Sequence, residues 1–237
     1  MEFWNDAKSI AQRDPAATGP WQVFWLYSGY HAVCWHRLAH WFYRHKLLFI
    51  ARAISQFSRF LTNIEIHPGA KIGKGLFIDH GTGVVIGETA EIGDYCTIYH
   101  GCTLGGTGKD IGKRHPTLGN NVLVGAGAKI LGPFQVGDNS RIGANSVVLQ
   151  EVPPNTTVTG VPGRQVKQKK AQTPAFDLDQ IHLPDPVYQE LKELMVKVEK
   201  MTADLEKSHQ EAAKQKAELE AELQAKLTAH ISEEKRQ

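Results

Sequence analysis

An aliphatic residue recurs at every sixth position through the middle of the chain, interrupted at two places. These positions are Ile66, Ile72, Ile78, Ile86, Ile92, Ile98, Leu104, Leu118, Val124, Ile130, Val136, Ile142 and Val148. A glycine often follows the aliphatic residue, and a small side chain often stands four positions after it. A period of six fits neither a helix nor a single amphipathic strand. It is typical of hexapeptide repeats, in which three hexads form one triangular turn and the aliphatic side chain points inward. The pattern predicts a left-handed parallel β-helix over residues 64–164.

The two interruptions are the places where we expect function. The first adds two residues around Val84 and Val85. The second is Gly105 to Thr117, which reads GGTGKDIGKRHPT and is rich in glycine and basic residues. Loops that leave a rigid scaffold are frequent sites of binding and catalysis.

Helical patterns flank the repeats on both sides. In residues 1–63, apolar positions recur at spacings of three and four, as in an amphipathic helix, and these residues are predicted to cap the open end of the β-helix. Residues 165–186 are polar and proline-containing, which predicts a linker. A heptad then begins the tail, 187–237, with Val187, Leu191, Leu194, Val198, Met201 and Leu205. This predicts a long helix, and both a coiled coil over its first half and a solvated helix remain open.

Composition narrows the class of protein only slightly. The net charge of +2 over 237 residues gives no reason to expect nucleic acid as a partner. Three cysteines and no secretory signal are typical of a reducing compartment. The longest apolar run, Trp21 to Trp35, is shorter than the roughly 20 residues that cross a bilayer. We therefore expect a cytoplasmic protein with no membrane partner.

Four of the eleven histidines fall within the repeats, at positions 67, 80, 100 and 115. One turn is about 18 residues, and Glu65 and His80 are separated by nearly one turn. This spacing can bring a carboxylate beside an imidazole, and such a carboxylate would fix the ring tautomer and leave a free nitrogen as base. Arg114 and His115 on the second interruption can bind a substrate carboxylate.

These residues lie in segments that resemble the serine O-acetyltransferases, the hexapeptide-repeat enzymes that open cysteine biosynthesis. The segments are EIHPGAKIG, IDHGTGVVIGETA, TLGGTGKDIGKRHP, VGAGAKILG and TTVTGVPGR. The resemblance runs from Arg13 to Arg164, about two-thirds of the chain. Hexads alone indicate an acyltransferase, whereas the GGTGK and RHP loop and the DHGTG segment indicate this family.

The resemblance implies transfer of acetyl from acetyl-CoA to the hydroxyl of L-serine, giving O-acetyl-L-serine and CoA. Acetyl-CoA is then a co-substrate, and no bound cofactor or metal is expected. His80 matches the catalytic base, and Glu65 stands where many members carry the aspartate that partners this base. The residues that match the serine site are Asp14 and Asp79 for the ammonium group, and Arg114 and His115 for the carboxylate. The residues that match or neighbour the acetyl-CoA site between adjacent β-helices are Gly106, Thr107, Lys109, Ala126, Ala144 and Arg164.

The resemblance also implies a homo-oligomer. Only the short segment from Met1 to Arg13 precedes Asp14, whereas some members have a longer helical region that joins two trimers, and this favours a homotrimer over a hexamer. Members that dock into O-acetylserine sulfhydrylase do so with a C-terminal isoleucine. This chain ends in Glu-Lys-Arg-Gln, so that complex is not favoured. Feedback inhibition by cysteine at the serine site stays open.

Three alternatives remain at this point. A hexapeptide O-acetyltransferase for a sugar or xenobiotic hydroxyl would keep His80 but would need no clamp for a zwitterion. A metal-dependent β-helix hydratase would use three of His67, His80, His100 and His115 around zinc. A non-catalytic scaffold would rely on the helical tail.

Overall fold

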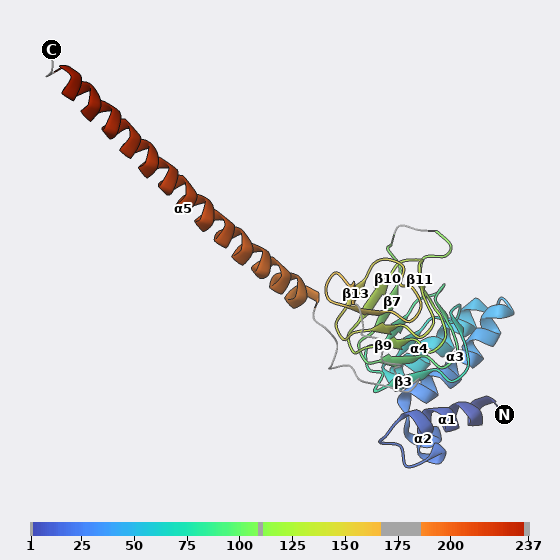
Figure 1. Cartoon of the computed structure of the whole chain (residues 1–237). Coiled ribbons are helices and arrows are strands. Elements are labelled where there is room, and N and C mark those ends of the chain that lie inside the picture. Colours follow the sequence, from blue (N-terminus) through green and yellow to red (C-terminus); the bar gives the residue numbers. More distant parts are fainter. Residues whose placement is uncertain (1, 109–110, 167–185, 235–237) are drawn as a thin grey trace. The chain divides into compact units, whose positions relative to one another are not determined.

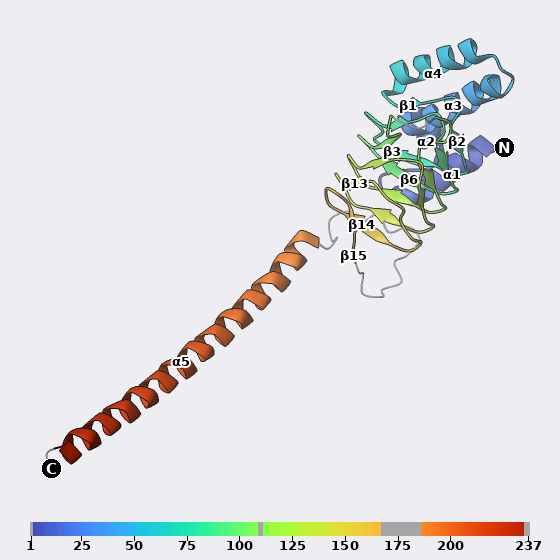
Figure 2. The same cartoon turned by 90° about the horizontal axis from the view of Figure 1, so that it is seen from above.

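The computed structural model describes residues 2–108, 111–166 and 186–234. The chain divides into two units, Met1–Pro186 and Val187–Gln237, and each is described by itself. In the first unit, helices cover the end of a β-helix that begins with β1, and β14 and β15 lie at its other end (Figure 1, Figure 2).

Three sheets form the three sides of the β-helix, and from β1 to β13 successive strands enter successive sheets. The first sheet contains β1 (Glu65–Ile66), β4 (Val85–Ile86), β7 (Thr103–Gly105), β10 (Lys129–Leu131) and β13 (Val147–Val148). The second contains β2 (Lys71–Ile72), β5 (Glu91–Ile92), β8 (Thr117–Leu118) and β11 (Gln135–Val136). The third contains β3 (Phe77–Asp79), β6 (Thr97–Tyr99), β9 (Leu123–Val124), β12 (Arg141–Ile142), β14 (Thr157–Thr159) and β15 (Arg164–Val166). All pairs are parallel except β14 with β15. The predicted parallel β-helix is confirmed.

Strand register locates both interruptions. Glu65 aligns with Val85, so the first turn exceeds three hexads by two positions. Val85 aligns with Thr103, and this regular turn is three hexads long. Thr103 aligns with Lys129, so the next turn exceeds three hexads by eight positions. The extra residues lie between β3 and β4 in the first case and between β7 and β8 in the second, as the sequence predicts.

The aliphatic positions form one continuous stack inside the coil. Ile98, Ile130 and Ile142 are fully buried, and small buried residues such as Ala90 and Ala128 fill the corners beside them. Full burial of such an aliphatic side chain stabilises the fold by about 1.5–3 kcal/mol. The repeat therefore supplies most of the hydrophobic core, and Ala32 and Val33 from the preceding helical region join it.

Four helices cap the first turn. They are α1 (Glu2–Arg13), α2 (Pro20–Leu26), α3 (Ser28–Arg44) and α4 (Leu48–Thr62). A Cβ on Gly29 of α3 would lie 2.1 Å from the carbonyl oxygen of Ile78, so the helix backbone packs directly on β3. The Arg13 guanidinium at the end of α1 is buried and donates to the carbonyl oxygens of Gly75, Tyr95 and Cys96. These contacts bring the residue after α1, Asp14, to the third sheet.

The described part of the second unit belongs to one helix, α5 (Pro186–Glu234). Its large apolar side chains are exposed, among them Leu191, Leu194, Val198, Met201 and Leu205. Across the described part of the chain, no helix has the length and apolarity needed to span a membrane. The coiled coil remains a prediction. Most of the predicted linker lies outside the described residues, and its first two residues, 165–166, belong to β15.

Candidate active site

Two corners of the triangular coil carry the predicted site residues. The turns that lead from the third sheet into the first, at residues 80–84, 100–102, 125–128 and 143–146, are called the His80 corner. The turns that lead from the first sheet into the second, at residues 67–70, 87–90, 106–108 and 111–116, are called the loop corner. The second interruption of the repeat is the long turn of the loop corner.

His80 occupies the two-residue insertion of the first turn. Its φ is 58°, in the left-handed region that non-glycine residues rarely adopt. Such conformations persist where the surrounding structure enforces them, and they cluster at functional sites. The imidazole is largely exposed, its Nε2 lies 3.8 Å from Asp79 Oδ1, and its ring centroid is 6.1 Å from that of His100 on the next turn.

Glu65 does not contact His80 among the described residues. Its carboxylate forms ion pairs with Arg52, at 3.2 Å, and Arg59, at 3.1 Å, both on α4. The spacing between Glu65 and His80 suggested neighbouring positions because a regular turn is about 18 residues. The first turn is longer than a regular one, so Glu65 aligns with Val85 instead. Among the described residues, the carboxylate that pairs with the base is that of Asp79.

Asp14 joins Asp79 at the His80 corner. Asp14 Oδ2 accepts a hydrogen bond of 2.5 Å from the Tyr27 hydroxyl, and Oδ1 accepts the Ala16 N–H at 2.8 Å. Partial burial raises the pKa of Asp79, and the nearby Asp14 raises it further, while His80 and His100 oppose the shift. Burial likewise raises the pKa of Tyr27 to about 12, with the Asp14 hydrogen bond adding to it. Two carboxylates beside an open imidazole can bind a small cationic group such as an ammonium.

Arg114 and His115 lie at the loop corner and face Glu88 and Thr89. Arg114 Nη2 lies 2.5 Å from Glu88 Oε2, and the His115 ring is nearly buried against the turn that contains Gly87. Burial lowers the pKa of His115, and the adjacent Arg114 lowers it further. A guanidinium beside a neutral imidazole can bind a carboxylate. The structure thus separates the predicted serine residues into an acidic group at one corner and a basic group at another.

The predicted acetyl-CoA residues divide in the same way. Gly106 and Thr107 lie at the loop corner, whereas Ala126 and Ala144 lie in turns of the His80 corner. Arg164 begins β15 at the end of the coil. Lys109 lies outside the described residues.

Three partners of the site residues were not predicted from the repeat pattern: Tyr27, Glu88 and Thr89. Glu88 and Thr89 fall within the GETA part of a segment that carries the family resemblance, so a signal was present. No periodicity or motif pointed to Tyr27, because its contact with Asp14 depends on how α2 packs against the end of α1.

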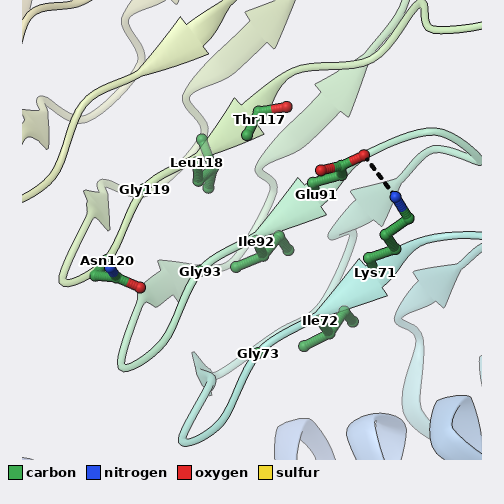
Figure 3. A pocket seen from close by; sticks show the side chains of 10 residues that line it. All are labelled: Lys71, Ile72, Gly73, Glu91, Ile92, Gly93, Thr117, Leu118, Gly119 and Asn120. Carbon is green, nitrogen blue, oxygen red and sulfur yellow. Dashed lines mark hydrogen bonds and ion pairs between the residues drawn. The ribbon is translucent and has the colours of Figure 1, made fainter.

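A shallow groove of about 400 Å³ crosses β2, β5 and β8 on the second sheet (Figure 3). Lys71 Nζ and Glu91 Oε1 form an ion pair of 3.0 Å across it. None of the predicted site residues lines this groove. It is therefore separate from the arrangement of the two corners.

The four histidines of the repeat are also divided between the corners. His67 and His115 lie at the loop corner, and His80 and His100 at the other. Within residues 2–108, 111–166 and 186–234, no three His, Cys, Asp or Glu side chains are grouped as metal ligands would be. The zinc arrangement considered from the sequence is thus not assembled by the described residues of one chain.

A hexapeptide coil with an open histidine beside carboxylates and a basic loop on another corner defines a hexapeptide-repeat acyltransferase. Residues 115–150 match the family described as bacterial transferase hexapeptide (six repeats). The chain is 57% identical over 196 residues to a serine acetyltransferase of Staphylococcus aureus, which covers 83% of this chain and 92% of the relative. The chain belongs to the serine acetyltransferase family.

Solved structures agree with this assignment. Serine acetyltransferase of Neisseria gonorrhoeae in complex with serine is 41% identical, with a TM-score of 0.68, covering 70% of this chain and 68% of that one. Serine acetyltransferase of Brucella abortus in complex with coenzyme A is 46% identical, with a TM-score of 0.69, covering 72% of this chain and 68% of that one.

Proposed function

We propose that this protein transfers the acetyl group of acetyl-CoA to the hydroxyl of L-serine, giving O-acetyl-L-serine and CoA. The family assignment supports this reaction, and relatives have been solved with serine and with coenzyme A. Serine is a zwitterion, and the chain offers an acidic pair, Asp14 and Asp79, and a basic pair, Arg114 and His115. A sugar hydroxyl acceptor would need neither pair.

In this reaction His80 acts as the general base. It removes the proton of the serine hydroxyl while that oxygen attacks the thioester carbonyl, and a C–O bond forms. The C–S bond then breaks, and His80 returns the proton to the departing CoA sulfur. General base catalysis of this kind contributes about 10²–10⁴-fold. We propose that Glu65, whose carboxylate pairs with Arg52 and Arg59 in the single chain, also contributes to catalysis, and a Glu65→Gln variant with unchanged kcat would remove this role.

The predicted serine residues and the predicted acetyl-CoA residues are both divided between the same two corners. This observation extends the proposal to the oligomeric state. Within one chain, the acidic pair with His80 and the basic pair lie in turns between different sheets. If the His80 corner of one copy adjoins the loop corner of the next, the serine and acetyl-CoA sites are both completed. We therefore propose a homotrimer with each active site shared by two copies.

Mixing inactive variants tests this arrangement. Co-expression of His80→Ala and Arg114→Ala chains with different affinity tags yields mixed oligomers. With random assembly, about one quarter of the shared sites contain both intact halves, so we expect the mixture to regain about that fraction of wild-type activity. His80→Ala mixed with Asp79→Ala is the matched control, because both changes affect one corner and no mixed site is intact. Equal activity of the two mixtures would contradict the shared site.

An acceptor panel tests the substrate itself. Release of CoA thiol from acetyl-CoA is measured with L-serine, L-threonine, L-homoserine and a galactoside. We expect serine to be preferred, and an inert serine with a reactive galactoside would overturn the proposal.

We also propose that the reaction takes place in the cytoplasm. All three cysteines lie within the described residues as free thiols, and Cys96 and Cys102 are buried. Free thiols persist where the surroundings are reducing.

A further inference from the structure

Glu88 and Thr89 follow β4 at the loop corner and contact the returning arm of the long turn. The Thr89 carbonyl oxygen accepts a hydrogen bond of 2.7 Å from Lys113 Nζ. Its hydroxyl oxygen accepts the backbone N–H groups of Arg114, at 3.0 Å, and of His115, at 3.1 Å. One side chain therefore fixes the backbone of both residues that form the basic pair.

Thr89 also determines which nitrogen of His115 carries the proton. The Thr89 backbone N–H points to His115 Nδ1 at 3.2 Å, and the Thr89 hydroxyl lies 2.9 Å from the same nitrogen. A backbone N–H can only donate, so Nδ1 must accept and the ring proton must be on Nε2. His115 thereby presents an N–H donor, as recognition of a carboxylate oxygen requires.

Glu88 holds the side chain of Arg114 in the same way. Glu88 Oε2 pairs with Arg114 Nη2, and Oε1 accepts a hydrogen bond of 3.0 Å from the Tyr43 hydroxyl on α3. The Arg114 pair holds the pKa of Glu88 below its usual range, so this carboxylate stays ionised. Arg114 Nη1 also donates to the Gly112 carbonyl oxygen at 3.3 Å. A guanidinium has five N–H donors, and its contacts with the described residues use two of them.

We propose that Thr89 and Glu88 are positioning residues that orient His115 Nε2–H and the Arg114 guanidinium toward the substrate carboxylate. This inference rests on the proposed function, because it assigns the selection of a carboxylate-bearing acceptor to these two side chains. Neither residue needs to touch the substrate. The Thr89 hydroxyl acts through the backbone N–H groups of Arg114 and His115, while its backbone N–H fixes the His115 tautomer in any variant. Glu88 acts through the guanidinium of Arg114.

The test compares L-serine with L-serinamide, which has the same hydroxyl and ammonium groups but no carboxylate. Thr89→Val keeps the shape of the side chain and removes the hydroxyl, whereas Thr89→Ser restores the hydroxyl. We expect Thr89→Val to raise the KM for serine and lower its kcat/KM by roughly 10- to 100-fold, as expected when hydrogen bonding to a charged group is lost. The kcat/KM for serinamide should stay near the wild-type value, and Thr89→Ser should recover most of the preference for serine.

Glu88→Gln should give a smaller loss of the same kind, because the amide can still accept one hydrogen bond. Glu91→Gln is the matched control. This substitution also removes ion pairs, those with Lys71 and Lys113, but Glu91 does not contact Arg114 or His115 in the described structure. A thermal melt of each variant identifies any loss of folding. Equal losses for serine and serinamide, or an unchanged preference in Thr89→Val, would overturn the inference. A wild-type enzyme inactive on serine would instead refute the proposed function.

Discussion

Replacement of Gly87 by alanine adds one methyl group at the place where the His115 ring rests. A Cβ at Gly87 would lie 2.0 Å from His115 Cδ2 and 2.1 Å from His115 Nε2, far inside van der Waals contact. The φ of Gly87 lies outside the left-handed region, so alanine can adopt the backbone. The imidazole must rotate away, and both of its contacts with Thr89 are then lost.

The size of the effect follows from these contacts. Two neutral hydrogen bonds contribute about 0.5–1.5 kcal/mol each, so the free energy of unfolding should fall by no more than about 3 kcal/mol. The bond from His115 to the substrate carboxylate is charge-assisted and contributes about 1.5–3 kcal/mol. At about 1.36 kcal/mol per tenfold, its loss should lower kcat/KM for serine by about 10- to 150-fold.

The assay measures kcat/KM for serine in Gly87→Ala, His115→Ala and the double variant. If the methyl group acts only through the ring, the double variant should match His115→Ala, because no ring remains to be displaced. An equal additional loss in the His115→Ala background would show that Gly87 acts by another route. Wild-type kinetics in Gly87→Ala would refute the role of His115 in binding serine.

Four further predictions concern other parts of the molecule. His80→Ala should lower kcat by at least about 100-fold, with an unchanged circular dichroism spectrum and melting temperature, and a variant that keeps a tenth of the activity would exclude His80 as the base. His36 is 4% exposed, and burial holds its pKa at about 3. The unfolded chain therefore takes up a proton below pH 6.5 that the folded chain does not, so stability falls with falling pH; the loss attributable to His36 is roughly 2 kcal/mol from pH 7 to pH 5. Urea unfolding at both pH values should show a smaller loss in His36→Asn. Deletion of 187–237 should leave kcat unchanged, since the β-helix ends before α5. In the full chain, a parallel coiled coil of α5 predicts disulfide cross-linking by Ser208→Cys in the heptad seam and none by Gln210→Cys on the opposite face, and equal cross-linking would contradict it.

The scaffold could be predicted from the sequence because its core residues recur with a period of six. Each aliphatic position from Ile66 to Val148 marks one side of the coil, and the two lapses in spacing mark the two irregular turns. The helices at the first turn could be expected as a cap, but their contacts could not. Arg52 and Arg59 bind Glu65 because of the way α4 packs, and that packing has no counterpart in the repeat. Tyr27 reaches Asp14 for the same reason.

The sequence could identify the site residues but could not predict their positions relative to one another. Counting hexads assigns residues 79–80 and 114–115 to different corners, but it does not show which side chains share a substrate. The family resemblance identifies which residues act on serine and says little about their neighbours. The GETA segment contains Glu88 and Thr89, but their roles follow only from their hydrogen bonds to Arg114 and His115. These bonds span a separation in sequence that matches the enlarged turn and not a regular one.

Strand pairing across the long turn shows that the length of the binding loop can change without a change in the fold. Thr103 and Lys129 pair in the first sheet as directly as Val85 and Thr103 do, although eight additional residues lie between them. Each strand is held by the turns above and below it, so the coil closes whatever length of chain leaves the corner. Residues 106–116 can therefore lengthen, shorten or change charge with little cost to the stacked core. Selection for a different acceptor can act on this turn while the aliphatic stack stays as it is.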